Sequence, residues 1–592
     1  MAITQTDRSI AISTVLGGDA LLLRSLEGTE AVSNCFGFTL GLLSENDAIN
    51  LEDLVGTRAT VAITDADGTA RCWNGYISRF TQGTRERVLT EYTAQLVPWL
   101  WFLTLRTDSR IFQEMTVRDI VTDVFSRAEF HDFEWRTQGT CRTRDYCVQY
   151  QETDFDFVSR LLEDEGICYF FEHTADKHVL VLADDASAYK PCAGQESVRY
   201  ATSRGGFLRE DRITEWKAGR AFCTSGVSLA DFNFTTPKTD LTVSVEGDNA
   251  FQTYHYPGGY PVRGEGQSLV DVRSEELRSR LETIDGTSTC RAFRAGTRFD
   301  LLDHYRTDFN RPYVITRVRH AAFEGGYDIG VGRSSSDGSR YTNDFVCIPA
   351  SVAFRPERRT WRQRVDGCQT ATVVGPSGSE IYTDEYGRVK VQFHWDRQGQ
   401  RNERSSCWIR VAQAWAGAGW GAVAIPRIGQ EVVVDFLEGD PDRPIIVGTV
   451  YNAAQMPPYK LPANGDMTGI RSNTTKGGNG YNEVAFRDKE SEELIRIHAQ
   501  GDMHVTVRRD VAEQFERNHA ELVTGERYLK ARRIILEAED EICIKVGGNH
   551  VQISSSGVNV EGKMVDVNCG HPASNTGIAA LKPEAPRDRE QN

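Results

Sequence analysis

The sequence predicts a mainly β protein built from several domains, and three observations support this prediction. A chain of 592 residues is long enough to hold three or four domains, each with its own core. Apolar and polar residues alternate in short runs along most of the chain, whereas only three segments carry the spacing of amphipathic helices. From about residue 500 onward, glycines interrupt short alternating runs, which indicates short strands joined by tight turns.

Residues 1–370 form the first predicted region, which is rich in strands. Within it, the runs 61–64 and 69–73 flank Asp67-Gly68, a dipeptide that favours the tight turns of two-residue hairpins. We therefore expect an antiparallel hairpin near the start of the chain.

Three helices are expected within this region. The first begins at Thr116, where Asp119 completes a capping-box pair. The second begins at residue 153 or 154 and ends at Gly166, which suits the left-handed conformation of a helix C-cap. The third covers residues 268–283, and its apolar residues stand on an otherwise charged background: Val272, Leu277 and Leu281.

Residues 371–456 are predicted to form a small barrel. In one strand, three apolar residues are expected inside and three polar residues outside: Val389, Val391 and Phe393 against Lys390, Gln392 and His394. The run 432–436 suits a strand that is buried on both faces, and glycines supply the turns at Gly387, Gly429 and Gly439. About five short strands in roughly seventy residues is the size of an OB-type Greek-key barrel.

A connector over residues 457–480 precedes a predicted spike over residues 481–570. Five short alternating runs in the spike are expected to be strands, at residues 503–507, 542–546, 551–553, 558–560 and 565–567. Such strands can form a sandwich, a single-chain solenoid or an intertwined trimer. A lone chain would leave its apolar faces and strand edges open, whereas three chains wound around one axis would cover both.

The last predicted segment, residues 571–592, is expected to be a flexible tail. Pro583, Pro586 and interspersed charges oppose continued strand pairing. Because the tail follows the tip of the spike, we expect it to help recruit whatever caps that tip, the alternative being a passive terminus.

Several segments of the chain closely resemble one protein family. The barrel segments resemble the OB domain of VgrG proteins, the spikes of type VI secretion systems, and of related phage hub and spike proteins; they are residues 384–396, 407–413, 424–436 and 440–448. Further matches to the same family lie in residues 150–169, 296–301 and 477–489. The resemblance implies an N-terminal phage-hub-like region of β-barrel subdomains with helical inserts, an OB-fold barrel and a C-terminal intertwined trimeric β-helix or prism.

The same resemblance implies a structural protein and not an enzyme. A family member is expected to form a homotrimer, to sit on a tube of Hcp protein and to receive a PAAR-repeat protein and an effector or adaptor at its tip. Contacts with baseplate components and, transiently, with the target membrane are also expected. The chain would assemble in the cytoplasm and then be secreted by the type VI apparatus. Two alternatives are a spike of a phage or phage-derived tail and a β-solenoid enzyme that acts on polysaccharides.

Composition argues against several other classes of protein. A net charge of −16 disfavours nucleic acid as a partner, because phosphate binding needs clustered Lys and Arg. No apolar run approaches the roughly twenty residues of a membrane span, and residues 1–13 lack the features of a Sec signal peptide. The thirteen cysteines contain no CxxC pair, which favours reduced thiols over a zinc site.

No catalytic, cofactor-binding or metal-ligating residue is predicted. Residues 417–422 fit the dinucleotide-binding GxGxxG/A pattern, but strand-forming residues follow where that fold needs a helix. The acidic clusters 163–165 and 184–185 are expected to be solvated and not to form a glycosidase pair. Three histidines could meet a metal on a threefold axis, but we favour outward-facing polar turns for them: His498, His504 and His571.

Overall fold

The computed structural model describes residues 3–567, except for residue 7, residues 65–68, residues 203–209, residue 326 and residues 328–339. The chain forms two compact units, Met1–Ala416 with Gly421–Met456, and Gly417–Trp420 with Pro457–Asn592. Strands predominate over helices in the described residues, which contain three α-helices. The predicted mainly β class is therefore confirmed.

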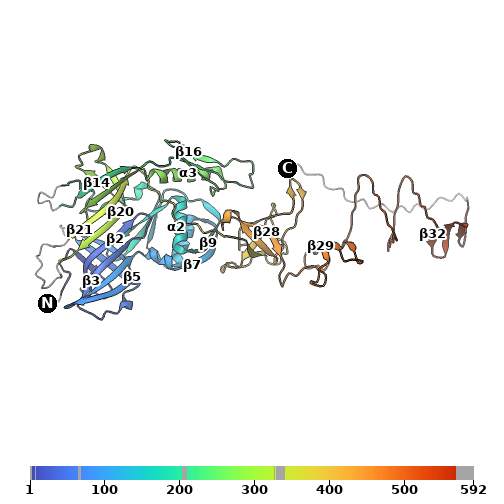
Figure 1. Cartoon of the computed structure of the whole chain (residues 1–592), viewed down its shortest axis with the longest axis horizontal. Helices are drawn as coiled ribbons and strands as arrows, with labels where there is room; N and C mark the ends of the chain where they lie inside the picture. The colour runs from blue at the N-terminus through green and yellow to red at the C-terminus, as the bar shows by residue number, and fades with distance from the viewer. Residues whose placement is uncertain are drawn as a thin grey trace. The chain divides into compact units, whose positions relative to one another are not determined.

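A thirteen-stranded sheet dominates the first unit (Figure 1). Its strands are β1 (Ile10–Ser13), β2 (Leu22–Ala31), β3 (Gly37–Ser44), β4 (Arg58–Thr64), β5 (Ala70–Glu86), β6 (Leu89–Val97), β12 (Lys190–Pro191), β13 (Ser197–Arg199), β14 (Ile213–Arg220), β18 (Glu282–Ser288), β19 (Thr297–Leu302), β20 (Pro312–Phe323) and β21 (Arg340–Pro349). Their order is β1-β4-β5-β6-β3-β2-β20-β21-β18-β14, and β19 pairs with β20, β12 and β13 beside this path.

The pairing of β2 with β20 joins segments that are far apart in the sequence. Residues 25–31 run antiparallel to residues 317–323 in this pair. The apolar residues of the first strands alternate inward and meet in one core, where Phe38, Trp73 and Tyr92 are fully buried. The predicted hairpin is present as β4 paired with β5, although its turn at residues 67–68 lies outside the described residues.

The first predicted helix has the expected start, and the second has the expected start and end. Helix α1 (Val117–Arg127) has Thr116 as its N-cap, and Thr116 and Asp119 form the predicted capping box. Helix α2 (Asp154–Glu165) ends at Gly166, which has a φ of 70° and is a left-handed C-cap. Both predictions are confirmed.

The third helix lies five residues earlier than predicted at both ends, as α3 (Arg263–Arg278). Its buried residues include Leu269 and Val270, which pack against a small three-stranded sheet. The helix stops before Leu281 because residues 282–288 are taken into β18, where they pair with β14 and β21. Tertiary pairing therefore overrides the local helical pattern at this end.

The remaining elements of this region are short. The sheet under α3 comprises β15 (Gly226–Leu229), β16 (Val243–Val245) and β17 (Gln252–His255), and a second three-stranded sheet comprises β8 (Phe133–Arg136), β10 (Cys168–His173) and β11 (His178–Ala183). A two-stranded ladder pairs β7 (Thr107–Thr116) with β9 (Thr143–Thr153). The 3-10 helices are η1 (Leu51–Asp53), η2 (Trp99–Leu105), η3 (Ala186–Ala188), η4 (Thr307–Phe309) and η5 (Leu437–Gly439). No helix in the described residues is long and apolar enough to span a membrane.

The predicted barrel is a five-stranded sheet. Its strands are β22 (Gln369–Val374), β23 (Lys390–Phe393), β24 (Arg410–Val411), β27 (Glu431–Phe436) and β28 (Pro444–Val450), beside the hairpin β25 (Ala416–Gly417) and β26 (Trp420–Gly421). The glycines expected at the turns all have positive φ, at Gly387, Gly429 and Gly439. As predicted, Val389, Val391 and Phe393 form the barrel core.

Two predictions about the barrel are wrong. Gln392 was expected to face outward but is buried, because the chain folds back over it; its amide donates to Asp396 and accepts from the backbone N–H of Arg401. Strand β27 was expected to be buried on both faces, but Asp435 is exposed and Val433 is half-buried. A barrel has a single interior, so only alternate residues of β27 are covered within this chain.

The second unit contains two antiparallel three-stranded sheets. The first comprises β29 (Met467–Arg471), β30 (Glu483–Arg487) and β31 (Leu494–His498), and the second comprises β32 (Glu541–Val546), β33 (Asn549–Ser554) and β34 (Gly557–Glu561). Three predicted strands are thus confirmed. Residues 503–507 and 565–567 form no strand, because an extended segment without a neighbour in its own chain has no partner for its backbone hydrogen bonds.

Candidate functional site

The sheet β32–β34 has one apolar face that its own chain leaves uncovered. In the register of this sheet, Ile544, Val551 and Val560 stand side by side, and Ile542, Ile553 and Val558 form the next row. Five residues of this face or its edge are exposed: Ile544, Val546, Ile553, Val558 and Val560. The opposite face is polar, with Cys543, Gln552 and Asn559 in one row.

The sheet β29–β31 repeats this arrangement. Ile470, Val484 and Ile497 form one row and are all exposed, and Phe486 and Ile495 lie in the next row of the same face. Among the described residues from 457 onward, only Glu483 and Ala485 are buried. Tyr459 and Arg496 both reach the Glu483 carboxylate. The apolar side chains of this unit therefore have almost no core of their own.

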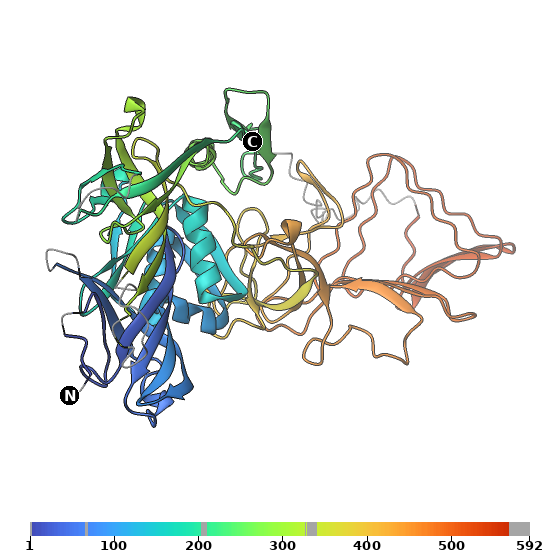
Figure 2. The same cartoon turned by 60° about the vertical axis from the view of Figure 1, so that its left-hand side comes forward.

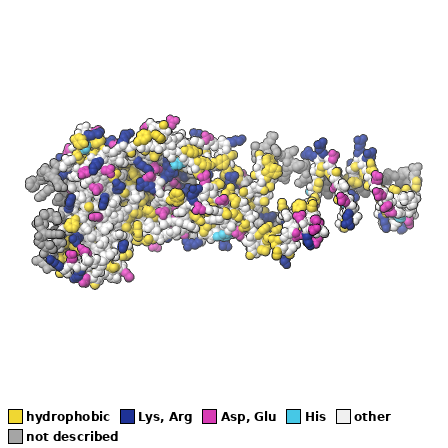
Figure 3. Space-filling model, in the orientation of Figure 1, with side chains coloured by type: hydrophobic (Ala, Val, Ile, Leu, Met, Phe, Trp, Pro, Cys, Tyr) yellow, Lys and Arg dark blue, Asp and Glu magenta, His cyan; other side chains and the backbone are white. Residues whose placement is uncertain are grey.

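The segment between the two sheets, residues 499–540, contains no strand or helix. It nevertheless carries large apolar side chains, and Leu522, Ile535 and Leu536 are among its exposed residues. The space-filling view also shows hydrophobic side chains, in yellow, at the surface of the described residues after the barrel (Figure 3). Exposed apolar side chains on two sheets and on the segment between them are typical of a surface that another chain covers.

In the first unit, half-buried ionic contacts fix the barrel to the rest of the unit, and we call them the barrel joint. Asp442 accepts a hydrogen bond from the backbone N–H of Val148 at 2.6 Å and pairs with Arg362, which also pairs with Asp440 at 3.0 Å. Arg160, on α2, donates to the carbonyl of Val148. In Figures 1 and 2, α2 lies between the large sheet and the barrel.

Burial and nearby charges shift the pKa values of Asp440 and of Asp164, an acid on α2 that interacts with Arg362 and Arg160 of this joint. It raises the pKa of Asp440, and the nearby carboxylate of Asp442 raises it further, whereas Arg362 opposes both effects. Burial would also raise the pKa of Asp164, but Arg144 and Arg362 outweigh it and lower that pKa to about 2. The joint is therefore held by charge pairs that depend on one another.

A loop that contains Asp231 and Phe234 also contacts the barrel, and we call these contacts the clamp. Arg388 and Arg410 lie over the ring of Phe234, with their guanidinium carbons 5.3 and 4.7 Å from its centroid. Asp231, from the same loop, pairs with Arg443 at 3.2 Å. Because the joint and the clamp both hold the barrel, it is fixed in the first unit from two sides.

The acidic clusters noted in the sequence have structural hydrogen bonds. The Glu163 carboxylate accepts from the Thr360 side chain and from the backbone N–H groups of residues 359 and 360. Asp184 accepts from the backbone N–H groups of residues 138 and 139, and Asp185 caps η3. None of these acids lines either of the two cavities found in the first unit.

The dinucleotide-like pattern and the histidines have similarly ordinary surroundings. Residues 417–422 lie in the β25–β26 hairpin, and the described residues directly after them, 423–430, form no helix. His498 packs against the ring of Tyr481 at 4.6 Å, and His571 lies outside the described residues. Within the described part of the chain, no group of three or more His, Cys, Asp or Glu side chains is placed to hold a metal ion.

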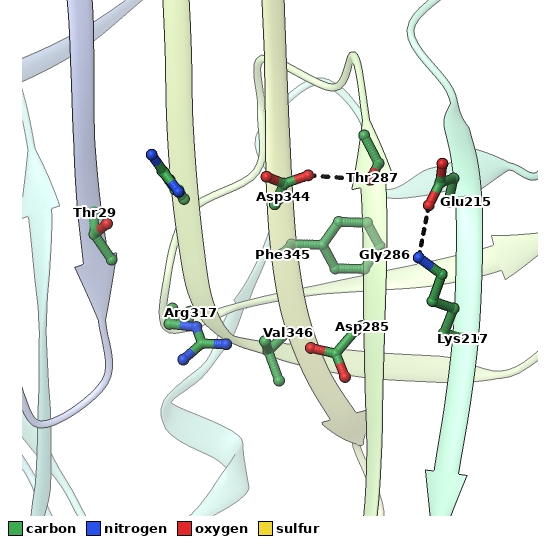
Figure 4. A pocket seen from close by; sticks show the side chains of 11 residues that line it. Thr29, Glu215, Lys217, Asp285, Gly286, Thr287, Arg317, Asp344, Phe345 and Val346 are labelled. Carbon is green, nitrogen blue, oxygen red and sulfur yellow. Dashed lines mark hydrogen bonds and ion pairs between the residues drawn. The ribbon is translucent and has the colours of Figure 1, made fainter.

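A cavity of about 520 Å³ lies on the polar face of the large sheet (Figure 4). It crosses β2, β14, β18, β20 and β21, so sequence patterns could not bring its residues together. Two of its acids have partners, since Lys217 pairs with Glu215 at 2.9 Å and Thr287 donates to Asp344 at 3.0 Å. The cavity is thus a charged groove whose acids come from separate strands.

Three family models match the chain. They are the phage tail baseplate hub at residues 29–326, the type VI secretion system/phage-baseplate injector OB domain at residues 379–451, and the bacteriophage T4 gp5 C-terminal trimerisation domain at residues 468–559. The first model alone covers half of the chain, and the third coincides with the uncovered apolar faces of β29–β34.

Curated relatives agree with these matches. The chain is 41% identical over 517 residues to the type VI secretion system spike protein VgrG1c of Pseudomonas aeruginosa, covering 86% of this chain and 71% of the relative. It is 33% identical over 628 residues to the actin cross-linking toxin VgrG1 of Vibrio cholerae, covering 96% of this chain and 56% of that longer protein.

A solved structure shows the same fold. An E. coli component of the type VI secretion system, described as structurally similar to the T4 tail proteins gp27 and gp5, matches with a TM-score of 0.55 and 21% sequence identity. The match covers 74% of this chain and 99% of that structure. At this level of identity the similarity concerns the fold.

Proposed function

The chain belongs to the VgrG family of type VI secretion system spike proteins, and from this membership we propose that it works as a homotrimer whose C-terminal strands wind around one axis. The observation that supports the trimer is the pair of uncovered apolar sheet faces within the segment that matches a trimerisation domain. Full burial of one Val, Leu, Ile, Phe or Met side chain contributes about 1.5–3 kcal/mol, so burying both faces would strongly favour association.

The proposed domain organisation follows the sequence prediction. Residues 1–370 form the hub, residues 371–456 the OB barrel, residues 457–480 a connector, residues 481–570 the spike and residues 571–592 the tail. The trimerisation model begins at residue 468 and β29 lies at residues 467–471, so part of the proposed connector already belongs to the sheet β29–β31.

The proposed task of the trimer is mechanical. A spike that is pushed through an envelope must stay folded, and chains that share every layer of a rod cannot separate one at a time, which favours high kinetic stability. We propose no catalytic role, because the acids noted in the sequence serve as structural hydrogen-bond acceptors. Toxin activity is named for a longer relative, of which this chain spans 56%.

The proposed partners follow from family membership. The hub would sit on the Hcp tube and contact the baseplate, and the spike tip would receive a PAAR-repeat protein together with an effector or adaptor. The trimer would assemble in the cytoplasm, be secreted by the type VI apparatus and touch the target membrane only in passing. The net charge of −16 supports proteins and not nucleic acids as its stable partners.

The mass of the purified full-length protein tests this proposal. Multi-angle light scattering at micromolar concentration should give three times the chain mass of 66.3 kDa. A stable, soluble monomer would contradict the proposed function. Secretion of the chain together with the tube protein, lost when the apparatus is disabled, would place the trimer in a type VI system and not in a phage-derived tail.

A further inference from the structure

A chain of hydrogen bonds joins the hairpin β10–β11 to the large sheet. His178, the first residue of β11, is buried and stands opposite His173, the last residue of β10. Its two ring nitrogens contact different elements: Nε2 lies 2.9 Å from the backbone nitrogen of Trp99 in η2, and Nδ1 lies 3.0 Å from Oδ1 of Asn74 in β5. One buried side chain therefore connects three elements of the hub.

The donors fix the direction of every hydrogen bond in this chain. Trp99 offers a backbone N–H, so Nε2 of His178 must be the acceptor and carries no proton. The ring proton therefore lies on Nδ1, which donates to the amide oxygen of Asn74. The amide nitrogen of Asn74 donates to the Thr60 hydroxyl in β4 at 2.8 Å, and Thr60 donates to the carbonyl of Ala175 at 2.7 Å. The chain thus returns to the turn between β10 and β11.

This arrangement accepts only the neutral form of the His178 ring. A protonated imidazole carries an N–H on both nitrogens, so the new N–H on Nε2 would face the N–H of Trp99. Two buried donors that face each other lose their hydrogen bond, and the added charge would lie beside the rings of Phe36 and Phe171. Protonation of His178 therefore breaks the connection to η2.

The charged groups near His178 do not offset this cost. Burial and then the positive charge of Arg58 lower the pKa of His178 to about 4, although Asp132 opposes them. The Asp132 carboxylate is shared by two cations, since it pairs with Arg58 at 3.4 Å and with Lys177 at 3.0 Å. Arg58 also donates to the hydroxyl of Tyr76, whose ring packs against His178.

The second histidine of the pair is also neutral. The backbone N–H of Asn74 donates to Nδ1 of His173 at 3.2 Å. Burial, followed by the charges of Arg294 and His178, places the pKa of His173 well below its ordinary value; the contact with Asn74 opposes this shift, and His320 adds to it. The cavity of about 200 Å³ that His173 lines contributes three further charged groups: Arg71, Lys190 and Glu172. Both rings are therefore neutral at pH 7.

We propose that His178 and its hydrogen-bond chain form an acid-sensitive lock, in which protonation of His178 frees η2 and the hairpin β10–β11 to open locally from the large sheet. A histidine whose pKa is lowered in the closed form binds fewer protons there than in the open form. The contribution of the lock to stability is therefore complete above about pH 6.5 and is lost as the pH falls toward 4. The hub stays closed at neutral pH and loosens at this place in mildly acidic surroundings.

Hydrogen exchange of the full-length protein tests the proposal, measured by mass spectrometry at pH 7 and pH 5 and corrected for the intrinsic exchange rates. The peptide that contains Trp99 should lose protection at least about tenfold at pH 5. A pKa of about 4 in the closed form and 6.5 in the open form shifts the opening equilibrium by about twentyfold over this range. The amides of β27 in the barrel are the internal reference and should keep their protection.

His178→Gln removes the titrating group and keeps an acceptor for the N–H of Trp99. Its protection at the Trp99 peptide should therefore change by less than about threefold between pH 7 and pH 5. His131→Gln is the matched control, since His131 is an exposed histidine of the same hub, and it should behave as the wild type does.

Three results would overturn the proposal: no loss of protection in the wild type, an equal loss in β27, or an undiminished loss in His178→Gln. Circular dichroism establishes that each variant is folded. If His178→Gln fails to fold, the comparison of the Trp99 peptide with β27 in the wild type still decides the question. None of these results bears on the trimer, because every residue of the lock belongs to one chain.

Discussion

Single residues determine how helix α2 ends and which face of the spike strands is apolar. Gly166 combines a left-handed φ of 70° with close packing, since a Cβ added there would lie 2.4 Å from Cγ1 of Val272 on α3. In the spike, Val560 and Asn559 are neighbours in β34 and stand on opposite faces of its sheet. A substitution at either site therefore tests the role of a single residue.

Replacing Gly166 with alanine should destabilise the hub. The left-handed backbone costs a non-glycine residue about 1–2 kcal/mol, and the contact with Val272 adds to this cost. Thermal unfolding followed by circular dichroism measures the effect. Gly264→Ala, in the first turn of α3 with open space around it, is the control and should leave the midpoint unchanged or raise it.

Replacing Val560 with aspartate should disrupt the trimer. In the proposed assembly this side chain is covered by other chains, so three carboxylates would be placed in an apolar interior with no cation to pair them. We expect the loss of a trimer band that resists heat and sodium dodecyl sulfate. Asn559→Asp adds the same charge to the polar face and should leave that band intact; equal resistance of both variants would show that the apolar face is misassigned.

Among the elements, the barrel joint also depends on pH. Two acids have pKa values shifted in opposite directions: that of Asp164, which interacts with Arg362 of the joint, is lowered to about 2, and that of Asp440 is raised. A lowered carboxyl pKa adds stability above the ordinary value of 3.8, and this stability is lost as the pH falls toward 2. A raised pKa has the reverse effect: the stability falls as the pH rises from the ordinary value of 3.8 to the raised pKa, and it stays lower above that pKa.

Asp164→Asn should therefore make the free energy of unfolding depend less on pH below about pH 4. Between pH 4 and pH 2 the wild type should lose about 2 kcal/mol that Asp164 supplies, and the variant should lack this contribution at neutral pH. Urea unfolding at a series of pH values measures the difference. Asp440→Asn should instead be neutral or stabilising at pH 7; a parallel loss in both variants would contradict the assignment of opposite shifts.

Elements whose signals are local could be predicted from the sequence. The start of α1 follows from Thr116 and Asp119, and the end of α2 follows from Gly166, residues that act within one helical turn. The start of α3 could not be predicted, because its first turn carries no apolar residue, and Leu269 and Val270 pack against the small sheet only from the second turn. Gln392 was misplaced for a similar reason, since the segment that covers it is irregular.

Contacts between distant segments could not be predicted at all. The charged groove draws Glu215, Thr287 and Asp344 from three different strands, and no spacing rule connects them. In the spike, the alternation of residues 503–507 suggests a strand, yet the chain offers that segment no partner of its own. Sequence patterns report which face is apolar, but they do not report which chain covers it.

For the whole molecule, the tail provides a separate test of how the tip is used. Deleting residues 572–592 should leave the trimer mass unchanged and should reduce the delivery of effectors, because these residues follow the tip and carry Pro583 and Pro586, which oppose strand pairing. Light scattering and an effector-delivery assay measure the two quantities. Unchanged delivery of every cargo would make the tail a passive terminus.

The antiparallel pairing of β2 with β20 also has a consequence for synthesis on the ribosome. Ser25 pairs with Phe323, so β2 must wait for almost three hundred further residues before its outer edge is covered. At the 5–20 residues per second of translation, that delay is about 15–60 seconds. During this time the nascent chain exposes a long strand edge, a site where neighbouring polysomal chains can pair wrongly. We therefore expect the hub to need chaperones mainly while its second half is still being synthesised.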